Sequence, residues 1–167
     1  MLKRFFAFIL LLFGAAEAPA EILQGRCSYV QDGDSLKFIP TGEEEEVRVR
    51  LYGIDAPEKS QEYAGQSRKK LEKLIRGKRI RLEVMDKDKY GRFVAKVYVG
   101  ETYVNLEMLK AGLAWRYDYY VDKKLDKALA QAEEDARQAR KGVWSGDSQV
   151  HPRDHRRTHG TVHSRKE

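Results

Sequence analysis

The chain carries four carboxylates in two turn-like stretches, Asp32 and Asp34 in DGDS and Asp55 and Glu58 in IDAPE. If both stretches lie at the same end of a small sheet, Asp34 and Asp55 would offer hard oxygen ligands to a divalent cation such as Ca²⁺. A backbone carbonyl and water would complete the shell, and the ligand spacing of an EF-hand loop is absent. Acidic residues in turns more often bond only to their local backbone, and the pattern alone favours this simpler interpretation.

Two arginines could turn such a cation site into a phosphate site. Arg50 lies in the alternating segment VRVRL just before Asp55, and Arg92 follows a turn in DKYGR. Guanidinium groups match two phosphate oxygens at once, so an arginine pair beside a cation suits phosphoryl transfer. The same side chains could instead form solvated ion pairs with the acidic run Glu43–Glu46, and sequence spacing does not separate the two interpretations.

Tyrosines lie among basic residues at two places, beside Lys89 as Tyr90 and in the stretch WRYDYY as Tyr117, Tyr119 and Tyr120. Stacking of a nucleic acid base on such a ring contributes about 1–3 kcal/mol, whatever the base. Tyrosine is amphipathic, so the same rings could simply cover the edge of a core.

The histidines of the chain recur at every fourth position near the C-terminus, at His151, His155, His159 and His163. On a helix they would share one face, and neutral imidazoles at that spacing bind zinc, nickel or copper. Pro152 and Gly160 argue against a continuous helix, so a solvated basic tail is the expected structure.

Segments with a two-residue hydrophobic period predict the strands that position these side chains. They cover residues 22–30, 35–39, 47–51, 80–84 and 93–97, with a hairpin turn at 31–34. Helical periodicity predicts helices over residues 60–77, with Ser60 as the cap, over 105–110 and over 122–141. We therefore expect an α+β fold with a mainly β core, an antiparallel five-stranded OB-fold barrel with three α-helices.

The two ends of the chain differ from its middle. Residues 1–20 place two basic residues before the apolar run Phe5–Phe13 and end in small residues, the pattern of a secretory signal peptide. The run is short for a transmembrane helix, which favours export to the periplasm or beyond over a membrane anchor. Residues 21–146 are expected to form the folded domain, and residues 147–167 a disordered, basic, histidine-containing tail.

Composition narrows the class of protein further. The 167 residues carry a formal net charge of +6, which favours polyanionic partners such as nucleic acid. A charged fraction of 35% excludes a polytopic membrane protein, and the single cysteine, Cys27, excludes an internal disulfide framework.

Six blocks of the sequence, taken in order, resemble the staphylococcal nuclease (thermonuclease) family: DGDSLKF, VRVRLYGIDAPE, YAGQSRKKLEKLI, DKYGRFVAKVYV, VNLEMLKAGLAW and GVWS. The resemblance runs from about Arg26 to Ser145 and depends on the conjunction of the blocks. It implies an OB-fold phosphodiesterase that needs Ca²⁺, cuts DNA and RNA and leaves 3′-phosphates.

The resemblance also implies roles for particular residues. Its catalytic residues fall on Arg50, Glu58 and Arg92. Its calcium ligands fall on Asp34, Asp55 and the main-chain carbonyl of Ala56, with Asp32 in the outer shell. Residues that contact substrate fall on Lys89 and Tyr90 and, by a weaker correspondence, on Tyr117 and Tyr120.

In this interpretation Glu58 orients or deprotonates the attacking water, and Arg50 and Arg92 stabilise the phosphorane-like transition state. Single-stranded or frayed nucleic acid is the expected substrate, no stable protein partner is implied, and the protein is expected to be a monomer. The alternative is a noncatalytic OB-fold module that binds nucleic acid. All five site side chains have the type that catalysis requires, which favours the enzyme.

Overall fold

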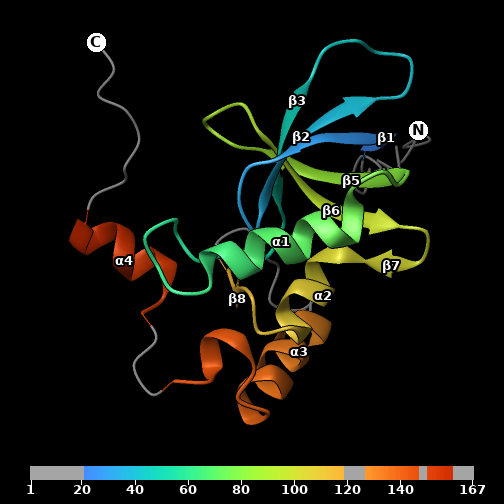
Figure 1. Cartoon of the computed structure of the whole chain (residues 1–167). Helices are drawn as coiled ribbons and strands as arrows, with labels where there is room; N and C mark the ends of the chain where they lie inside the picture. Colours follow the sequence, from blue (N-terminus) through green and yellow to red (C-terminus); the bar gives the residue numbers. More distant parts are fainter. Residues whose placement is uncertain (1–20, 119–126, 147–149, 160–167) are drawn as a thin grey trace, which may run out of the picture.

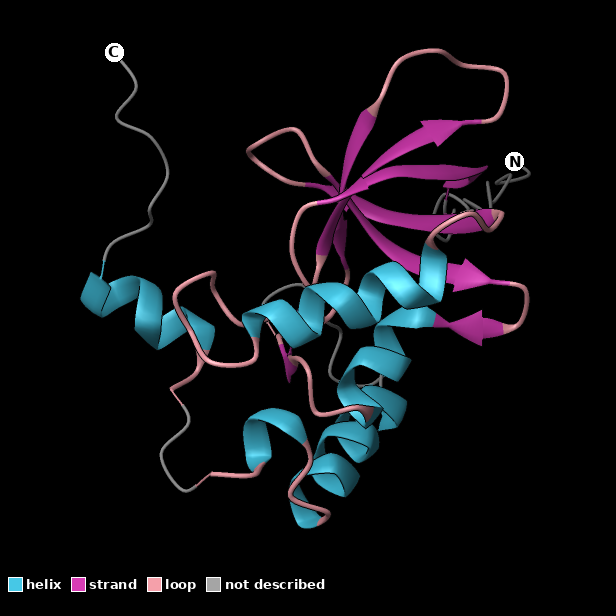
Figure 2. Ribbon diagram, viewed as in Figure 1, coloured by secondary structure: helices cyan, strands magenta, loops and turns pink. Residues whose placement is uncertain are grey.

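A computed structural model of the chain describes residues 21–118, 127–146 and 150–159, and its centre is a β-barrel (Figures 1 and 2). The barrel strands are β1 (Glu21–Val30), β2 (Ser35–Pro40), β3 (Val47–Leu51), β5 (Ile80–Lys87) and β6 (Phe93–Val99). Strand β1 pairs with β2 and β5, β2 with β3, and β6 with both β5 and β3, so the sheet closes on itself. The predicted five-stranded OB-fold barrel is confirmed.

One pairing departs from the expected antiparallel sheet. Strands β3 and β6 close the barrel in parallel, with Val49 opposite Phe93 and Arg50 opposite Val94. Three short strands lie outside the closed ring: β7 (Thr102–Tyr103) continues the sheet beyond β6, and β4 (Ile54–Asp55) pairs with β8 (Trp115–Arg116). The β4–β8 pair matters for the site because it fixes the backbone of Asp55.

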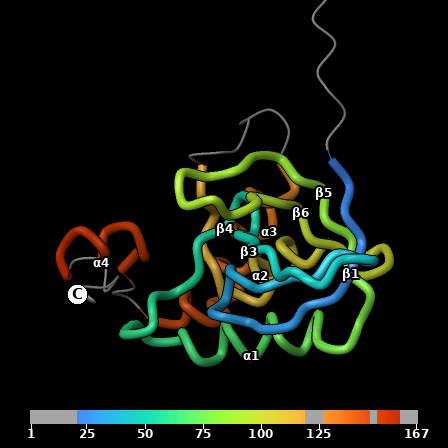
Figure 3. The backbone as a smooth tube through the Cα atoms, turned by 90° about the horizontal axis from the view of Figure 1, so that it is seen from above, coloured from blue at the N-terminus to red at the C-terminus, as the bar shows by residue number. Residues whose placement is uncertain are grey.

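Apolar side chains from the alternating strands fill the barrel, and two helices close over it. Phe38, Leu51 and Leu82 are fully buried. Helix α1 (Ala64–Ile75) runs alongside β1 (Figure 3) and buries Leu71 and Ile75, one helical turn apart, against the core. Helix α2 (Val104–Lys110) buries Met108 and Leu109, and α3 (Lys127–Gln138) packs on α2.

Helix boundaries follow the predictions at α2 and differ elsewhere. Helix α1 begins at Ala64, because Tyr63 has the left-handed φ of 66° and the preceding residues form a turn. The predicted cap at Ser60 was therefore wrong. The first part of the predicted helix 122–141 lies outside the described residues, and α3 ends at Gln138, before the 3₁₀ turn η1 (Gly142–Trp144).

The prediction of a disordered tail was wrong for residues 150–159. They include helix α4 (Pro152–His159), a fourth α-helix where three were expected, and it lies beside the loop that precedes α1 (Figures 1 and 3). Pro152 occupies the first helical position, where its missing N–H costs nothing. The segment docks through polar and aromatic contacts, which a count of aliphatic residues does not detect.

The predicted signal peptide at 1–20 lies outside the described residues. Within 21–118, 127–146 and 150–159, no helix is long and apolar enough to cross a bilayer.

Candidate active site

The register of the barrel strands brings the two acidic turns together. The β1–β2 hairpin places Asp32 and Asp34 just before β2, and Ser35 at the start of β2 pairs with Arg50 in β3. The backbone N–H of Leu51 donates to the carbonyl of Asp34 across 2.7 Å. Arg50 therefore lies on the strand directly beside Asp34.

Arg50 joins the two turns through its guanidinium. Its Nη1 lies 3.0 Å from Asp34 Oδ2, and its Nη2 lies 2.8 Å from Asp55 Oδ1. The N–H of Ala56 donates to Asp34 Oδ2 across 2.6 Å, which fixes the peptide after Asp55 against the first turn. Asp34 and Asp55 are 6% and 1% exposed. We call Asp34, Arg50 and Asp55 the central cluster.

Local backbone geometry also holds the first turn in place. The N–H of Asp34 donates to Asp32 Oδ1 across 3.0 Å, so Asp32 makes the local turn contact that the simpler interpretation predicted. Gly33 is required by packing, because a Cβ at this position would lie 1.8 Å from Ser67 Oγ on α1. The hydroxyl of Ser35 donates to Asp34 Oδ1 across 2.8 Å.

Burial and neighbouring charges shift the pKa values of the groups around Arg50. Burial, reinforced by the charge of Asp34, raises the pKa of Asp32 to about 7. Burial also raises the pKa of Asp55, although the charge of Arg50 opposes this. Burial alone would lower the pKa of Arg50, but the charges of Asp34, Asp55 and Asp32 outweigh it and raise that pKa.

This donor set fits a divalent cation with few protein ligands. Carboxylate oxygens of Asp34 and Asp55 lie around one guanidinium, and Asp32 accepts from the backbone of Asp34, so both turns contribute oxygen atoms to one place. Oxygen ligands of this kind suit Ca²⁺. Within the described part of the chain no group of three or more His, Cys, Asp or Glu side chains is arranged to hold a metal, so a backbone carbonyl and water would have to supply the remaining ligands.

The other two predicted catalytic residues lie outside the central cluster. Glu58 lies in the loop after β4, with its side chain 38% exposed. Arg92 lies in the β5–β6 turn, and its Nε donates to Asp88 Oδ2 across 2.7 Å. Among the described residues, the contacts of Arg92 run to Asp88 and the Tyr90 ring, not to the cluster. The parallel β3–β6 pairing nevertheless places Arg92 next to the strand that carries Arg50.

The β5–β6 turn presents an exposed ring among cations. Tyr90 is 60% exposed, and Lys89 Nζ and Arg92 Cζ lie 5.2 and 5.6 Å from its ring centroid. Burial acts to raise the pKa of Asp88, but hydrogen bonds from Arg92 and Tyr90 outweigh it and hold that pKa below its usual range. Asp88 therefore remains ionised and keeps Arg92 in place.

The predicted tyrosines after Trp115 are only partly described. The N–H of Tyr117 donates to the carbonyl of Gly53 across 2.9 Å, which places Tyr117 opposite the residue before β4, whereas Trp115 lies opposite Asp55. Tyr119 and Tyr120 lie outside the described residues.

Sequence reasoning missed Arg156 on α4. Its Nη1 lies 2.6 Å from Glu58 Oε1, and its Nη2 lies 2.8 Å from Asp55 Oδ2. The sequence does contain the pattern of a short helix around Arg156. Pro152 stands at its start, Asp154 lies in its first turn, and basic residues lie in its last turn. The described histidines of this helix, His155 and His159, contact each other, with their Nδ1 atoms 3.3 Å apart.

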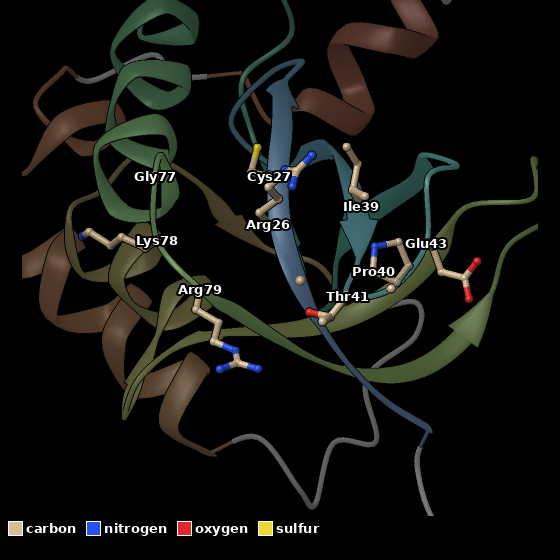
Figure 4. Close-up of a pocket in the computed structure, with 11 residues that line it drawn as sticks. Arg26, Cys27, Ile39, Pro40, Thr41, Glu43, Gly77, Lys78 and Arg79 are labelled. Atoms are coloured by element: carbon tan, nitrogen blue, oxygen red, sulfur yellow. The ribbon is translucent and has the colours of Figure 1, made fainter.

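A shallow pocket of about 430 Å³ lies elsewhere, at the opposite end of β2 from Asp34 (Figure 4). Arg26, Lys78 and Arg79 line it together with Glu43. It contains none of the predicted site residues and stands apart from the chemistry of the central cluster.

Comparisons with known proteins cover the segment that carries most of these residues. The family model described as "Staphylococcal nuclease homologue" matches residues 48–146, a range that includes Arg50, Asp55, Glu58 and Arg92.

Three relatives are similar over most of the chain. An "Uncharacterized endonuclease" of Haemophilus influenzae is 39% identical over 128 residues, covering 77% of this chain and 70% of its own length. A protein of the same description from Escherichia coli O157:H7 is 34% identical over 152 residues, covering 90% of this chain and 95% of its own. A "Probable staphylococcal-like nuclease CAN1" of Oryza sativa subsp. japonica is 38% identical over 71% of this chain and 37% of its own length. This chain belongs to the family of staphylococcal nuclease homologues.

Proposed function

We propose that this protein is a nuclease that hydrolyses phosphodiester bonds of DNA and RNA. The observation that carries the proposal is the central cluster, where two turns far apart in sequence meet at one buried guanidinium. Membership of a nuclease family and relatives described as endonucleases support it. The basic net charge of +6 suits a polyanionic substrate.

The cation of this site is proposed to be Ca²⁺, held by Asp34, Asp55 and the carbonyl of Ala56. Its chemistry there would be to neutralise the charge that builds up on a phosphate oxygen. The approach of buried carboxylates from both turns to one place beside Arg50 supports this assignment.

Three side chains of the site would each have a separate role at the reacting phosphate. Arg50 donates hydrogen bonds to a nonbridging oxygen from a fixed position, since Asp34 and Asp55 hold its guanidinium. Glu58 holds the attacking water and accepts or orients its proton, a role that suits a half-exposed carboxylate at the mouth of the cluster. Arg92 donates to the departing 5′-oxygen, so the phosphate stays on the 3′ side.

Substrate contacts outside the reacting phosphate are assigned to the β5–β6 turn and to the tyrosines that follow β8. Lys89 and Tyr90 would bind a neighbouring phosphate. The positive charges of Lys89 and Arg92, which lie beside the exposed ring of Tyr90, would attract that phosphate. Tyr117, beside β4, and Tyr120 would stack on bases. A single strand can splay its bases onto such rings, so we propose a preference for single-stranded or frayed ends.

We further propose that the protein is exported by its N-terminal segment to the periplasm or beyond and works as a monomer. The basic and apolar pattern of residues 1–20 supports export.

The test is digestion of one end-labelled oligonucleotide, as DNA and as RNA, with Ca²⁺ and with EGTA, followed by analysis of the product ends. We expect cleavage of both substrates in Ca²⁺, 3′-phosphate ends and no cleavage in EGTA. Full cleavage in EGTA would overturn the calcium assignment. Binding of the oligonucleotide without any cleavage would favour the noncatalytic OB-fold module instead.

A further inference from the structure

The C-terminal segment of described residues 150–159, which we call the arm, includes α4 at one side of the molecule (Figures 1 and 3) and contacts the site through the side chain of Arg156. Arg156 makes three hydrogen bonds from the arm to the carboxylates of Asp55 and Glu58. Its Nη2 donates to Asp55 Oδ2 across 2.8 Å, and its Nη1 donates to Asp55 Oδ1 across 3.2 Å and to Glu58 Oε1 across 2.6 Å.

These contacts use the same oxygens that the proposed reaction needs. Oδ1 of Asp55 accepts from both Arg50 and Arg156, and Oδ2 accepts from Arg156, so each carboxylate oxygen of Asp55 has a guanidinium partner. A cation bound to Asp55 would lie within a few ångströms of a second positive charge and would be repelled. Glu58 likewise has one oxygen committed to Arg156 and not to water.

Contacts away from the central cluster hold the arm in position. Ser60 Oγ and His155 Nε2 are hydrogen-bonded at 2.9 Å, and Gln61 Nε2 donates to the carbonyl of Val150 across 2.7 Å. The His151 ring lies against Trp115 with centroids 5.6 Å apart, and His155 is 8% exposed. The arm is thus seated on the loop before α1 and on β8, and this seat aims Arg156 at the carboxylates.

The contacts that hold the arm are few and partly exposed, so the arm can dissociate from the site. Helix α4 has eight residues and contributes two buried side chains, Pro152 and His155. A helix this short is marginal without packing, and its ion pairs are partly exposed, with 28% of the Arg156 side chain accessible. A cation or a phosphate that binds the site more strongly can therefore displace the arm.

We propose that the arm is an autoinhibitory element in which Arg156 occupies Asp55 and Glu58 in competition with the divalent cation and the nucleic acid phosphate. This inference rests on the proposed function. The alternative is a direct role of Arg156 in binding the substrate phosphate, and the hydrolysis rate at saturating calcium distinguishes the two.

The test compares the full chain with Arg156→Gln by calorimetric titration with Ca²⁺ and by hydrolysis rates over a range of calcium concentrations. Removal of a partly exposed competing ion pair should tighten calcium binding roughly threefold to tenfold and raise the rate at subsaturating calcium by a similar factor. At saturating calcium the two rates should converge.

The matched control is Arg157→Gln on the same helix, since Arg157 pairs with Asp154 and its side chain is 65% exposed. It removes the same charge from the arm and should leave calcium affinity as in the wild type. A second variant, Ser60→Ala, removes the hydrogen bond to His155 without touching Arg156 and should change calcium affinity in the same direction as Arg156→Gln.

The outcomes separate this inference from the proposed function. Unchanged or weaker calcium binding in Arg156→Gln, or a lower rate at saturating calcium, would overturn autoinhibition, and the lower rate would indicate a substrate contact. Tighter calcium binding with no hydrolysis by any variant would support the arm as a competitor for the cation and overturn the nuclease assignment. No calcium uptake by either protein would overturn autoinhibition and the calcium assignment, and hydrolysis of the oligonucleotide would still decide the nuclease assignment.

Discussion

The central cluster and the arm hold the same carboxylate, Asp55, in two different ways. Arg50 is a strand residue whose neighbours are set by barrel register, and its side chain is 13% exposed. Arg156 reaches the same carboxylate from an eight-residue helix and remains 28% exposed. Arg50 is therefore a fixed part of the site, whereas Arg156 can leave Asp55 when the arm moves away.

The largest expected effect comes from Arg50→Ala. Asp34 would then be buried without its guanidinium partner and Asp55 would keep only Arg156, which should cost about 3 kcal/mol of unfolding free energy in EGTA. Loss of a preorganised donor should also lower kcat by about 10²–10³-fold. Urea unfolding and oligonucleotide hydrolysis measure the two effects. The control is Arg81→Ala, because Arg81 also pairs with an acid on a barrel strand, Glu83, but away from the site. Equal losses in both variants would contradict a special role for Arg50.

Glu58→Gln should come next and should separate catalysis from stability. The side chain is 38% exposed, so the fold should tolerate the change, whereas loss of the base or water-orienting group should lower kcat by about 10²-fold or more. Hydrolysis at saturating calcium and a thermal melt measure the pair of outcomes. Glu62→Gln, at an exposed position nearby, should leave the rate unchanged. Wild-type speed in Glu58→Gln would remove this residue from the mechanism.

Calcium itself should stabilise the folded protein. A cation that binds only the native state adds about 2.7 kcal/mol at a concentration 100 times its dissociation constant, so Tm should rise with calcium and fall again in excess EGTA. Asp55→Asn should lose most of this rise because it removes a proposed ligand. A melting temperature that does not change with calcium concentration would argue against cation binding at the central cluster.

The smallest expected effect is the loss of stability in Arg156→Gln. Its ion pairs are partly exposed, so the unfolding free energy should fall by less than about 1 kcal/mol. Hydrogen exchange should show faster amide exchange in residues 150–159 with little change in the barrel strands. A loss as large as that of Arg50→Ala would show that the arm belongs to the scaffold after all.

Sequence patterns predicted the elements well and their spatial relations less well. Alternation placed β3 at Val47–Leu51, because one face of that strand is buried, but it carries no information on which strand closes the barrel. The parallel partner β6 is set by packing across the whole barrel. The start of α1 was missed because the left-handed backbone of Tyr63 is not encoded in hydrophobic periodicity.

For the site, too, residue types could be predicted from the sequence and spatial relations could not. Residue types indicated Asp34, Arg50 and Asp55, but spacing could not decide between turn contacts and a shared site, since the pairing of Ser35 with Arg50 decides it. Arg156 was missed because its helix is almost free of aliphatic side chains and docks through His155 and backbone contacts. Low hydrophobicity indicated disorder where polar contacts stabilise structure.

The central claim is that the divalent cation and the substrate phosphate both bind at the central cluster. The direct measurement is the calcium dependence of hydrolysis of one end-labelled oligonucleotide by the wild type and by Asp55→Asn. We expect saturable activation by calcium in the wild type and little or no activation in Asp55→Asn over the same range. Identical calcium curves for the two proteins would contradict the account.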